Sequence, residues 1–176
     1  YLGMLMKELN RQKELINQLL LAGRLESGKI HLEAVSMDLM PVLKESVLAV
    51  KAIANKRNIS VKLVSEYESM QIFGDTGGLS QVFINLINNA VKFSLPGKEV
   101  QVSAILDEAD AVVSITDHGL GIPADSISHL FERFYRAKNV TVAEIPGSGI
   151  GLYIVKSIVD ELQGLISVAS EVNQGT

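Results

Sequence analysis

Three asparagines, Asn85, Asn88 and Asn89, and one lysine interrupt the apolar helical pattern of "INLINNAVKFS", residues 84–94. At the 3.6-residue period of an α-helix, Asn85, Asn89 and Lys92 share one narrow face, while the apolar residues project away toward a core. Amide oxygens can bind a hard cation, and a lysine can neutralise phosphate as a point charge. A solvent-facing stripe is the alternative, although such faces favour Glu, Lys and Gln over clustered Asn. The pattern therefore predicts one wall of a binding site.

A second motif, "SITDHGLGIP", places Asp117 at the end of an expected strand, followed by Gly119 and Gly121. A carboxylate there can accept a hydrogen bond from an exocyclic amine, and the glycines allow the backbone to approach a planar ring. Asp-x-Gly is also ordinary turn chemistry, so the motif taken alone leaves both interpretations open. His118 is interpreted as an exposed turn residue.

A third motif, "PGSGIGLYIVK", has Gly147, Gly149 and Gly151 at the start of an expected helix. The free N–H groups of a helix N-terminus can bind phosphate. The G-x-G-x-G spacing and the loop before it do not fit a dinucleotide-binding fingerprint, which needs G-x-G-x-x-G directly after a strand. No P-loop sequence is present.

A fourth motif, "HLFERFYRAK", combines aromatic and basic residues. Aromatic rings provide a large apolar contact at low entropic cost, so these rings are expected to anchor a loop over residues 135–148. The basic residues could then reach phosphates when the loop closes. A plain helix end with core phenylalanines is the alternative. The aromatic residues are Phe131, Phe134 and Tyr135, and the basic residues are Arg133, Arg136 and Lys138.

Hydrophobic periodicity predicts the elements that hold these motifs, in a mixed α and β order with hairpins. Such an order indicates a two-layer α+β sandwich, in which helices cover one face of a mixed sheet. Glycines near 23 and 28 are expected to form a hinge between the first helix and the rest. The expected helices span 1–22, 39–56, 75–94, 124–135 and 150–163, and the expected strands span 30–35, 59–66, 100–106, 111–117 and 165–170.

The first expected helix carries apolar residues in a 3, 4, 3, 4 rhythm, which is typical of a helix that packs along another helix. A wider apolar face suits a four-helix bundle, with partners from a second chain. The alternative is an amphipathic helix that caps its own domain. The seam consists of Leu2, Leu5, Leu9, Gln12, Ile16 and Leu19, of which Gln12 alone is polar.

Composition excludes several functional classes. With 176 residues and 47% hydrophobic content, the chain can form one full core and an appendage. A net charge of -4 and a pI near 5.4 give no electrostatic footprint for nucleic acid. The absence of cysteine excludes a disulfide framework and thiolate zinc sites. No apolar run reaches the length of about 18–20 residues that spans a membrane, so we expect a cytoplasmic segment without membrane contact, whatever anchor its parent carries.

The order of the four motifs resembles the catalytic and ATP-binding domain of bacterial sensor histidine kinases, in the GHKL superfamily with its Bergerat-type fold. "LLLAGRLESGKI" is similar to the end of the second helix of that family's dimerisation and phosphotransfer domain. "FGDTGGLSQVFINLINNAVKFS" resembles the run into the asparagine box, although Gly78 stands where arginine is usual. The resemblance implies a dimerisation helix with its hinge over 1–28 and an ATP-binding domain over 29–176, whose last strand is expected to be missing.

The resemblance also implies roles for individual residues. Asn85 would supply an oxygen to Mg²⁺, and Asp117 would bind the adenine amine. Asn89 and Lys92 would approach the phosphates, and Phe93 would help to close the adenine side. The remaining residues of the implied ATP site are Gly119 and Gly121 in the adenine pocket, Gly147, Gly149 and Gly151 in the hinge of the lid, and Phe134, Arg136, Lys138 and Leu152 around that lid.

Position 85 separates branches of this superfamily. Gyrase-like, MutL-like and Hsp90-like ATPases carry glutamate there as the base that activates water, and Asn85 cannot take a proton. Efficient hydrolysis is therefore not expected, and the implied activity is transfer of the γ-phosphoryl group to a histidine and then to a response-regulator aspartate. None of His31, His118 and His129 fits the acceptor, so the acceptor helix is expected to lie outside this chain.

Two alternatives remain open at this level. One is a non-catalytic module that binds nucleotide and signals through its helix. The other is an anti-sigma-type serine kinase, which shares the fold but normally lacks a preceding dimerisation helix. The implied partners of the histidine kinase are a second copy of the chain, through the N-terminal helix, and a response-regulator receiver domain.

Overall fold

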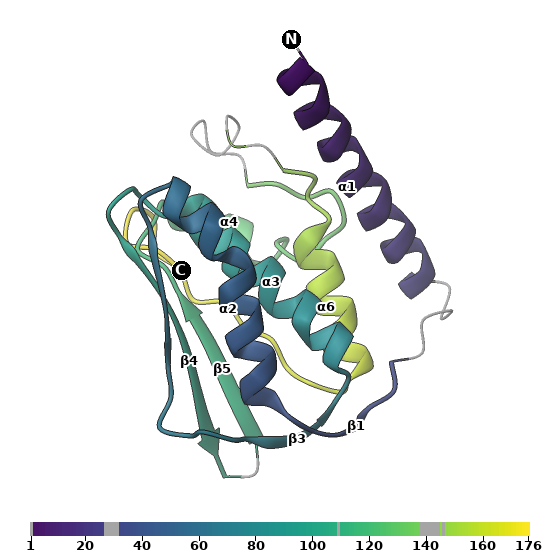
Figure 1. Ribbon diagram of the computed structural model, residues 1–176, viewed down its shortest axis with the longest axis vertical. Coiled ribbons are helices and arrows are strands. Elements are labelled where there is room, and N and C mark those ends of the chain that lie inside the picture. Colours follow the sequence, from purple (N-terminus) through teal and green to yellow (C-terminus); the bar gives the residue numbers. More distant parts are fainter. Residues whose placement is uncertain (1, 27–31, 109, 138–144, 146) are drawn as a thin grey trace.

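A sheet and a layer of helices form the two layers of the computed structural model, and the N-terminal helix lies along the outside of the helical layer (Figure 1). The structure describes residues 2–26, 32–108, 110–137, 145 and 147–176. Helices and strands alternate irregularly along the chain. The elements are α1 (Leu2–Glu26), β1 (Val35–Asp38), α2 (Leu39–Lys56), β2 (Ser60–Val64), β3 (Gln71–Gly74), α3 (Thr76–Phe93), β4 (Glu99–Asp107), β5 (Asp110–Thr116), α4 (Ala124–Ile127) and α6 (Gly151–Glu161).

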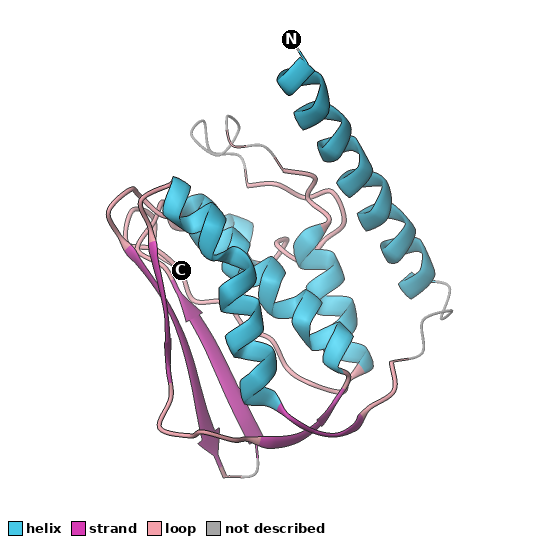
Figure 2. Ribbon diagram, in the orientation of Figure 1, coloured by secondary structure: helices cyan, strands magenta, loops and turns pink. Residues whose placement is uncertain are grey.

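The main sheet is mixed, as the sequence predicts. Its strand order is β2-β4-β5, with β2 parallel to β4 and β4 antiparallel to β5. Helices cover one face of this sheet (Figure 2). Alternate residues of β4 turn toward that layer, so Val100, Val102 and Ala104 are fully buried. The predicted fold class, a mixed sheet covered by helices on one face, is confirmed.

A separate antiparallel pair joins β1 to β3 at the edge of the domain. Its last register pair is Asp38 with Gln71. Asp38 also caps α2, because its Oδ1 accepts hydrogen bonds from the backbone amides of Met40 at 3.0 Å and Met70 at 2.8 Å. The Asp38 side chain therefore caps α2 and also links the start of this helix to the backbone just before β3.

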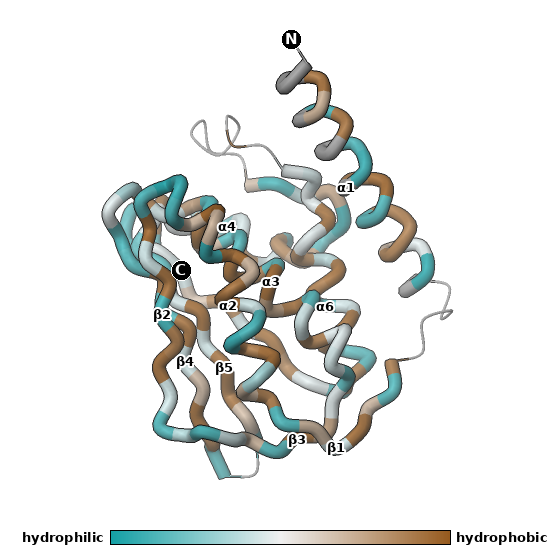
Figure 3. The backbone as a smooth tube through the Cα atoms, in the orientation of Figure 1, coloured by the Kyte–Doolittle hydropathy of each residue, from teal (hydrophilic) through white to brown (hydrophobic). Residues whose placement is uncertain are grey.

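Helix α3 is built from a cap and a core face. The Asp75 carboxylate accepts a hydrogen bond from the Gly78 amide at 2.7 Å, which satisfies one of the free donors at the helix start. Apolar residues such as Ile87 and Val91 are fully buried. Hydrophobic positions recur along the helices and along the strands of the sheet, where the tube is brown (Figure 3). Burial of this face points the opposite, polar face outward from the core.

Helices α3 and α6 approach each other at two glycines. A Cβ on Gly78 would lie 3.2 Å from Cγ2 of Ile158, and a Cβ on Gly151 would lie 3.2 Å from Oδ1 of Asn85. Both separations are tighter than ordinary packing contacts. The glycine at position 78, where the resemblance predicts arginine, thus lies in a tight contact with α6.

Several predicted boundaries are wrong. Helix α1 continues through Gly23, where the sequence predicts a hinge, because a packed helix tolerates the cost of about 1 kcal/mol for one glycine. The strand predicted over 30–35 is β1 at Val35–Asp38, where β3 pairs with it. Gly28, Ile30 and His31 lie outside the described residues, and β3 was not predicted.

Two later elements also differ from the prediction. The helix predicted over 124–135 ends at Ile127, and Phe134 adopts a left-handed backbone with φ of 64°, which is incompatible with a continuing helix. Residues 165–170 are not a strand: Leu165 is 98% exposed, and this segment forms no ladder with the described strands. The apolar residues of this segment alternate as they would in a strand, which led to the prediction, but none of the described strands pairs with it.

Candidate functional site

The stripe on α3 faces the start of α6. The Asn85 amide nitrogen donates a hydrogen bond to the Gln81 carbonyl at 3.0 Å, one turn earlier in the same helix. This bond turns the Asn85 amide oxygen away from its own helix, toward Gly151. Asn89 is half-buried one turn further along the same face. The stripe therefore presents an oxygen atom to the N-terminus of α6.

Lys92 lies at the end of the same face, beside the glycine motif. Its Nζ lies 4.8 Å from the centroid of the Phe93 ring, and a Cβ on Gly147 would lie 2.6 Å from Nζ. Burial lowers the pKa of Lys92 to about 8, with further lowering by the positive charges of Arg136 and Arg57. A cation that is partly desolvated and surrounded by like charges attracts an anion strongly.

Asp117 follows β5 directly and is 8% exposed. Its Oδ1 accepts a hydrogen bond from the Gly119 amide at 2.9 Å. Burial raises the pKa of this carboxyl, while hydrogen bonds from the backbone amides of Gly119 and Thr176 act in the opposite direction. The carboxylate is thus held in one orientation by backbone donors in a largely desolvated position.

The end of α3 and the Asp117 turn are joined by backbone contact. Ser94 forms an isolated antiparallel bridge with Gly119, and the Phe93 carbonyl accepts a hydrogen bond from the Leu120 amide at 3.2 Å. A Cβ on Gly119 would lie 2.2 Å from that carbonyl oxygen, so a side chain cannot fit there. Two motifs that are far apart in the sequence therefore form one continuous surface.

The C-terminal residues complete this turn, a contribution that sequence reasoning missed. The Asp117 amide donates a hydrogen bond to the Thr176 carbonyl at 2.9 Å. Gly121, with φ of 62°, lies against the Glu171 carbonyl, and Gly175, with φ of 119°, lies against the Asp117 carbonyl. The only hint of this contribution in the sequence was the glycine at position 175, because glycine readily adopts the positive φ that the close approach requires.

The aromatic and glycine motifs also contact each other. The Phe134 amide donates a hydrogen bond to the Gly149 carbonyl at 2.9 Å, and Gly149 has φ of 71°. Arg136 donates to the Ile145 carbonyl at 2.7 Å. The Phe134 ring is 57% exposed, with the Arg133 guanidinium 5.1 Å from its centroid. The ring therefore contributes little to the core.

The structure thus gathers most of the predicted site in one region. Residues of the α3 stripe contact the glycine motif, and the Asp117 turn contacts the end of α3. Leu152 is half-buried in the first turn of α6. Lys138 lies outside the described residues, as does most of the predicted loop over 135–148. The binding roles of all these residues remain predictions.

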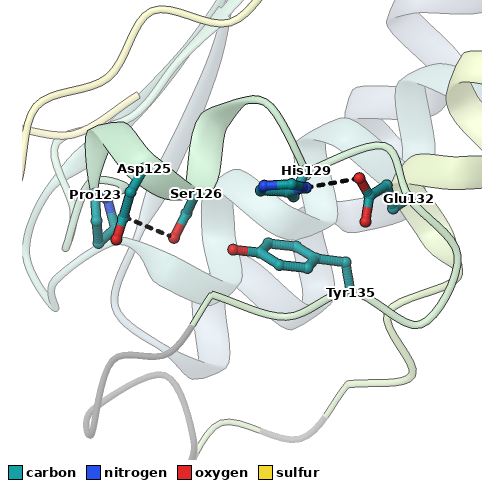
Figure 4. A pocket seen from close by; sticks show the side chains of 6 residues that line it. All are labelled: Pro123, Asp125, Ser126, His129, Glu132 and Tyr135. Carbon is teal, nitrogen blue, oxygen red and sulfur yellow. Dashed lines mark hydrogen bonds and ion pairs between the residues drawn. The ribbon is translucent and has the colours of Figure 1, made fainter.

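A cavity of about 500 Å³ lies elsewhere, beside α4 (Figure 4). Within it, Nδ1 of His129 lies 2.6 Å from a carboxylate oxygen of Glu132, and the His129 and Tyr135 rings are 5.4 Å apart. None of the predicted nucleotide-binding residues lines this cavity. Its lining consists of Pro123, Asp125, Ser126, His129, Glu132 and Tyr135.

The comparison with known families decides the classification. The family described as "Histidine kinase-, DNA gyrase B-, and HSP90-like ATPase" matches residues 74–176, which is more than half of the chain. The chain belongs to this ATPase family. The match begins at the last residue of β3 and contains the α3 stripe, the Asp117 turn and the glycine motif.

The relatives of this ATPase-family domain include sensor kinases. LuxQ of Vibrio parahaemolyticus, an autoinducer 2 sensor kinase/phosphatase, is 32% identical over 92% of this chain and 20% of its own length. ArlS of Staphylococcus haemolyticus, a signal transduction histidine-protein kinase, is 29% identical over 99% of this chain and 38% of its own length. The chain therefore spans about a fifth to two fifths of these curated relatives.

A solved structure supports the same fold. Full-length ShkA, crystallised in complex with AMPPNP, superimposes with a TM-score of 0.84 at 26% identity over 99% of this chain and 36% of ShkA. The expected histidine kinase resemblance is confirmed by these relatives. In the described part of this ATPase-family domain, no helix has the length and apolar character needed to cross a membrane.

Proposed function

We propose that this chain is the ATP-binding catalytic core of a two-component sensor histidine kinase. The observation that carries the proposal is the contact between the α3 stripe and the start of α6, with a buried carboxylate at the far end of α3. These groups suit the two ends of one ligand: Asp117 suits an amine on a planar base, and Lys92 with the N-terminus of α6 suits phosphates.

The donor set also fits a magnesium ion shared with phosphate. Among the described residues, no group of three or more His, Asp or Glu side chains could hold a metal. The Asn85 amide oxygen would be a single protein ligand, and Mg²⁺ commonly binds through few protein oxygens together with substrate phosphates. When bound, the ion would neutralise charge on the phosphates during transfer.

The residues of this chain would act by positioning the phosphates. Lys92 would balance negative charge at one side, and the free amides of Gly151 and Leu152 would donate hydrogen bonds at the other. Asn85 lacks a titratable group, so it cannot deprotonate a water molecule. The γ-phosphoryl group would therefore pass to a nucleophile from another segment, for which positioning and charge neutralisation are the main requirements.

The partners of the parent protein follow from the same proposal. The face of α1 with Leu5, Leu9, Ile16 and Leu20 is exposed, with each of these side chains at least 55% accessible. A second copy of the chain would cover this face in a helical bundle. A response-regulator receiver domain would take the phosphoryl group, and a cytoplasmic location of this segment belongs to the same proposal.

Phosphoryl transfer in trans tests the function. We expect the chain incubated with radiolabelled ATP and Mg²⁺ to remain unlabelled. The histidine-bearing helical domain of a relative such as ArlS, added as a separate polypeptide, should acquire label that acid removes. Acid-stable label on a serine would favour the serine kinase, and nucleotide binding without any transfer would favour the non-catalytic module. Label on the isolated chain would contradict the expected absence of its acceptor.

Lys92 gives nucleotide affinity an expected dependence on pH. With a pKa of about 8, its side chain is mostly charged near pH 7 and mostly neutral near pH 9. Phosphate favours the charged form, so affinity for MgATP should fall as pH rises through about 8. The variant Lys92→Arg stays charged and should flatten this dependence. Calorimetric titrations with MgATP at about pH 7 and about pH 9 measure the affinity of the wild type and of the variant. If the affinity of the variant depends on pH as strongly as that of the wild type, the pH dependence arises from another group.

The lowered pKa of Lys92 also determines whether this residue makes the free energy of unfolding rise or fall with pH. The folded chain binds fewer protons at Lys92 than the unfolded chain between about pH 8 and the ordinary lysine range. The contribution of this residue to the free energy of unfolding therefore rises with pH across that window.

A further inference from the structure

Helix α1 has a second face, which packs against the catalytic domain. Ala22 is fully buried within the main core cluster, and the neighbouring Leu21 packs against that cluster. Helix α1 contacts α6 and runs alongside it (Figure 1). At 3.6 residues per turn, Gln18 and Ala22 share this face, while Leu9, Ile16 and Leu20 lie on roughly the opposite side.

One hydrogen bond connects this face to the glycine motif. The Ser148 hydroxyl donates to Oε1 of Gln18 at 2.8 Å, across 130 positions of sequence. The same Ser148 oxygen accepts a hydrogen bond from the Ile150 amide at 3.3 Å. Gln18 and Ser148 are both half-buried. A side chain of α1 therefore holds the second residue of the glycine run, defined here as residues 147–151.

The glycine run lies on the two groups of the proposed phosphate site. Gly147 lies against Nζ of Lys92, and Gly151 lies against Oδ1 of Asn85. A Cβ has no room at either contact without displacement, since it would lie 2.6 Å and 3.2 Å away, respectively. Phosphates that bind between Lys92 and the start of α6 would have to displace the Gly147 end of the run. The bond from Gln18 opposes that displacement.

We propose that Gln18 is a positioning residue that holds the glycine run over Lys92 and Asn85 while α1 is packed against α6. Movement of α1 away from α6 breaks the bond to Ser148 and frees the run to admit the phosphates of the nucleotide. The inference rests on the proposed nucleotide site, but the hydrogen bond and its position do not depend on it.

Substitution of Gln18 tests this role through two measurements. Gln18→Ala removes the acceptor, and Asn17→Ala, one position away on an exposed part of α1, is the matched control. Amide hydrogen exchange without nucleotide should accelerate at Ile150 in Gln18→Ala and stay unchanged in Asn17→Ala. Affinity for MgATP should rise about two- to tenfold in Gln18→Ala, the range expected for loss of one hydrogen bond that opposes binding.

A conservative variant separates the bond from general packing. Gln18→Glu retains an acceptor oxygen for the Ser148 hydroxyl and should restore slow exchange at Ile150, and Ser148→Ala should reproduce the effect of Gln18→Ala. Unchanged exchange in Gln18→Ala, or weaker MgATP binding with accelerated exchange, would overturn the positioning role. If exchange accelerates but neither the wild-type chain nor any variant binds MgATP, the contact stands and the proposed function fails.

Discussion

Replacement of Asn85 by alanine is expected to reduce phosphoryl transfer at least about a hundredfold. The substitution removes the side-chain oxygen that lies against Gly151 at the N-terminus of α6. A metal ion on the phosphates contributes several kcal/mol to the transition state, and each 1.4 kcal/mol or so is a factor of about ten in rate. The trans-labelling assay measures this loss, together with MgATP affinity in the presence and absence of a chelator.

The fold should survive this change. Asn85 is half-buried, and its recorded hydrogen bond is to the Gln81 carbonyl of its own helix. Alanine is the better helix former by roughly 0.5 kcal/mol, so the unfolding temperature should stay level or rise slightly. Asn88→Ala, at a half-buried asparagine off the stripe, is the matched control with little expected effect. Equal loss in both variants, or collapse of the fold, would show that the stripe is structural.

Asp117→Asn is expected to weaken ATP binding about 10- to 100-fold. Asparagine keeps one oxygen for the Gly119 amide, but it presents an NH₂ donor where the carboxylate would accept a hydrogen bond from the adenine amine. Loss of a hydrogen bond to a charged group costs about 1.5–3 kcal/mol, which corresponds to this range of affinity. A competition binding assay that compares the ATP affinity of Asp117→Asn with that of the wild type measures this loss.

The choice of nucleotide gives this test its specificity. Guanine carries an acceptor where adenine carries its amine, so the wild-type chain should prefer ATP over GTP and Asp117→Asn should lose that preference. Asp110→Asn, at the exposed opposite end of β5, is the control and should bind both nucleotides as the wild type does. A preference for ATP that persists in Asp117→Asn would assign base recognition to other atoms.

The bounds of a helix or strand could be predicted from the sequence where a local pattern of residues determines them. Helix α2 begins and ends at the predicted residues 39 and 56, because Asp38 caps it and apolar periodicity continues to its end. Strand β3 was missed because its pairing with β1 is a contact between distant segments rather than a local pattern. The helix predicted from 124 onward is too long because periodicity does not reveal the left-handed backbone of Phe134.

The same distinction applies to the candidate site. Asn85, Asn89 and Lys92 were recognisable because they form a polar stripe on one face of an otherwise apolar helix. The hydrogen bond between Gln18 and Ser148 and the contribution of Thr176 have no local signature, since each joins segments that only the folded chain brings together. Residues whose side chains could bind a ligand were therefore recognisable in the sequence, whereas the distant residues that contact them were not.

The two glycine contacts between α3 and α6 have a geometric consequence for the site. Gly78 meets Ile158 and Asn85 meets Gly151, so each contact pairs one glycine with one side chain, and seven positions separate the two contacts on either helix. The helices are thus antiparallel and touch at two points that are two turns apart. A larger residue at position 78 would act as a wedge and tilt one axis against the other. The gap at Asn85 is therefore adjustable from a position about 10 Å away along α3, without any change to the groups that would bind the ligand.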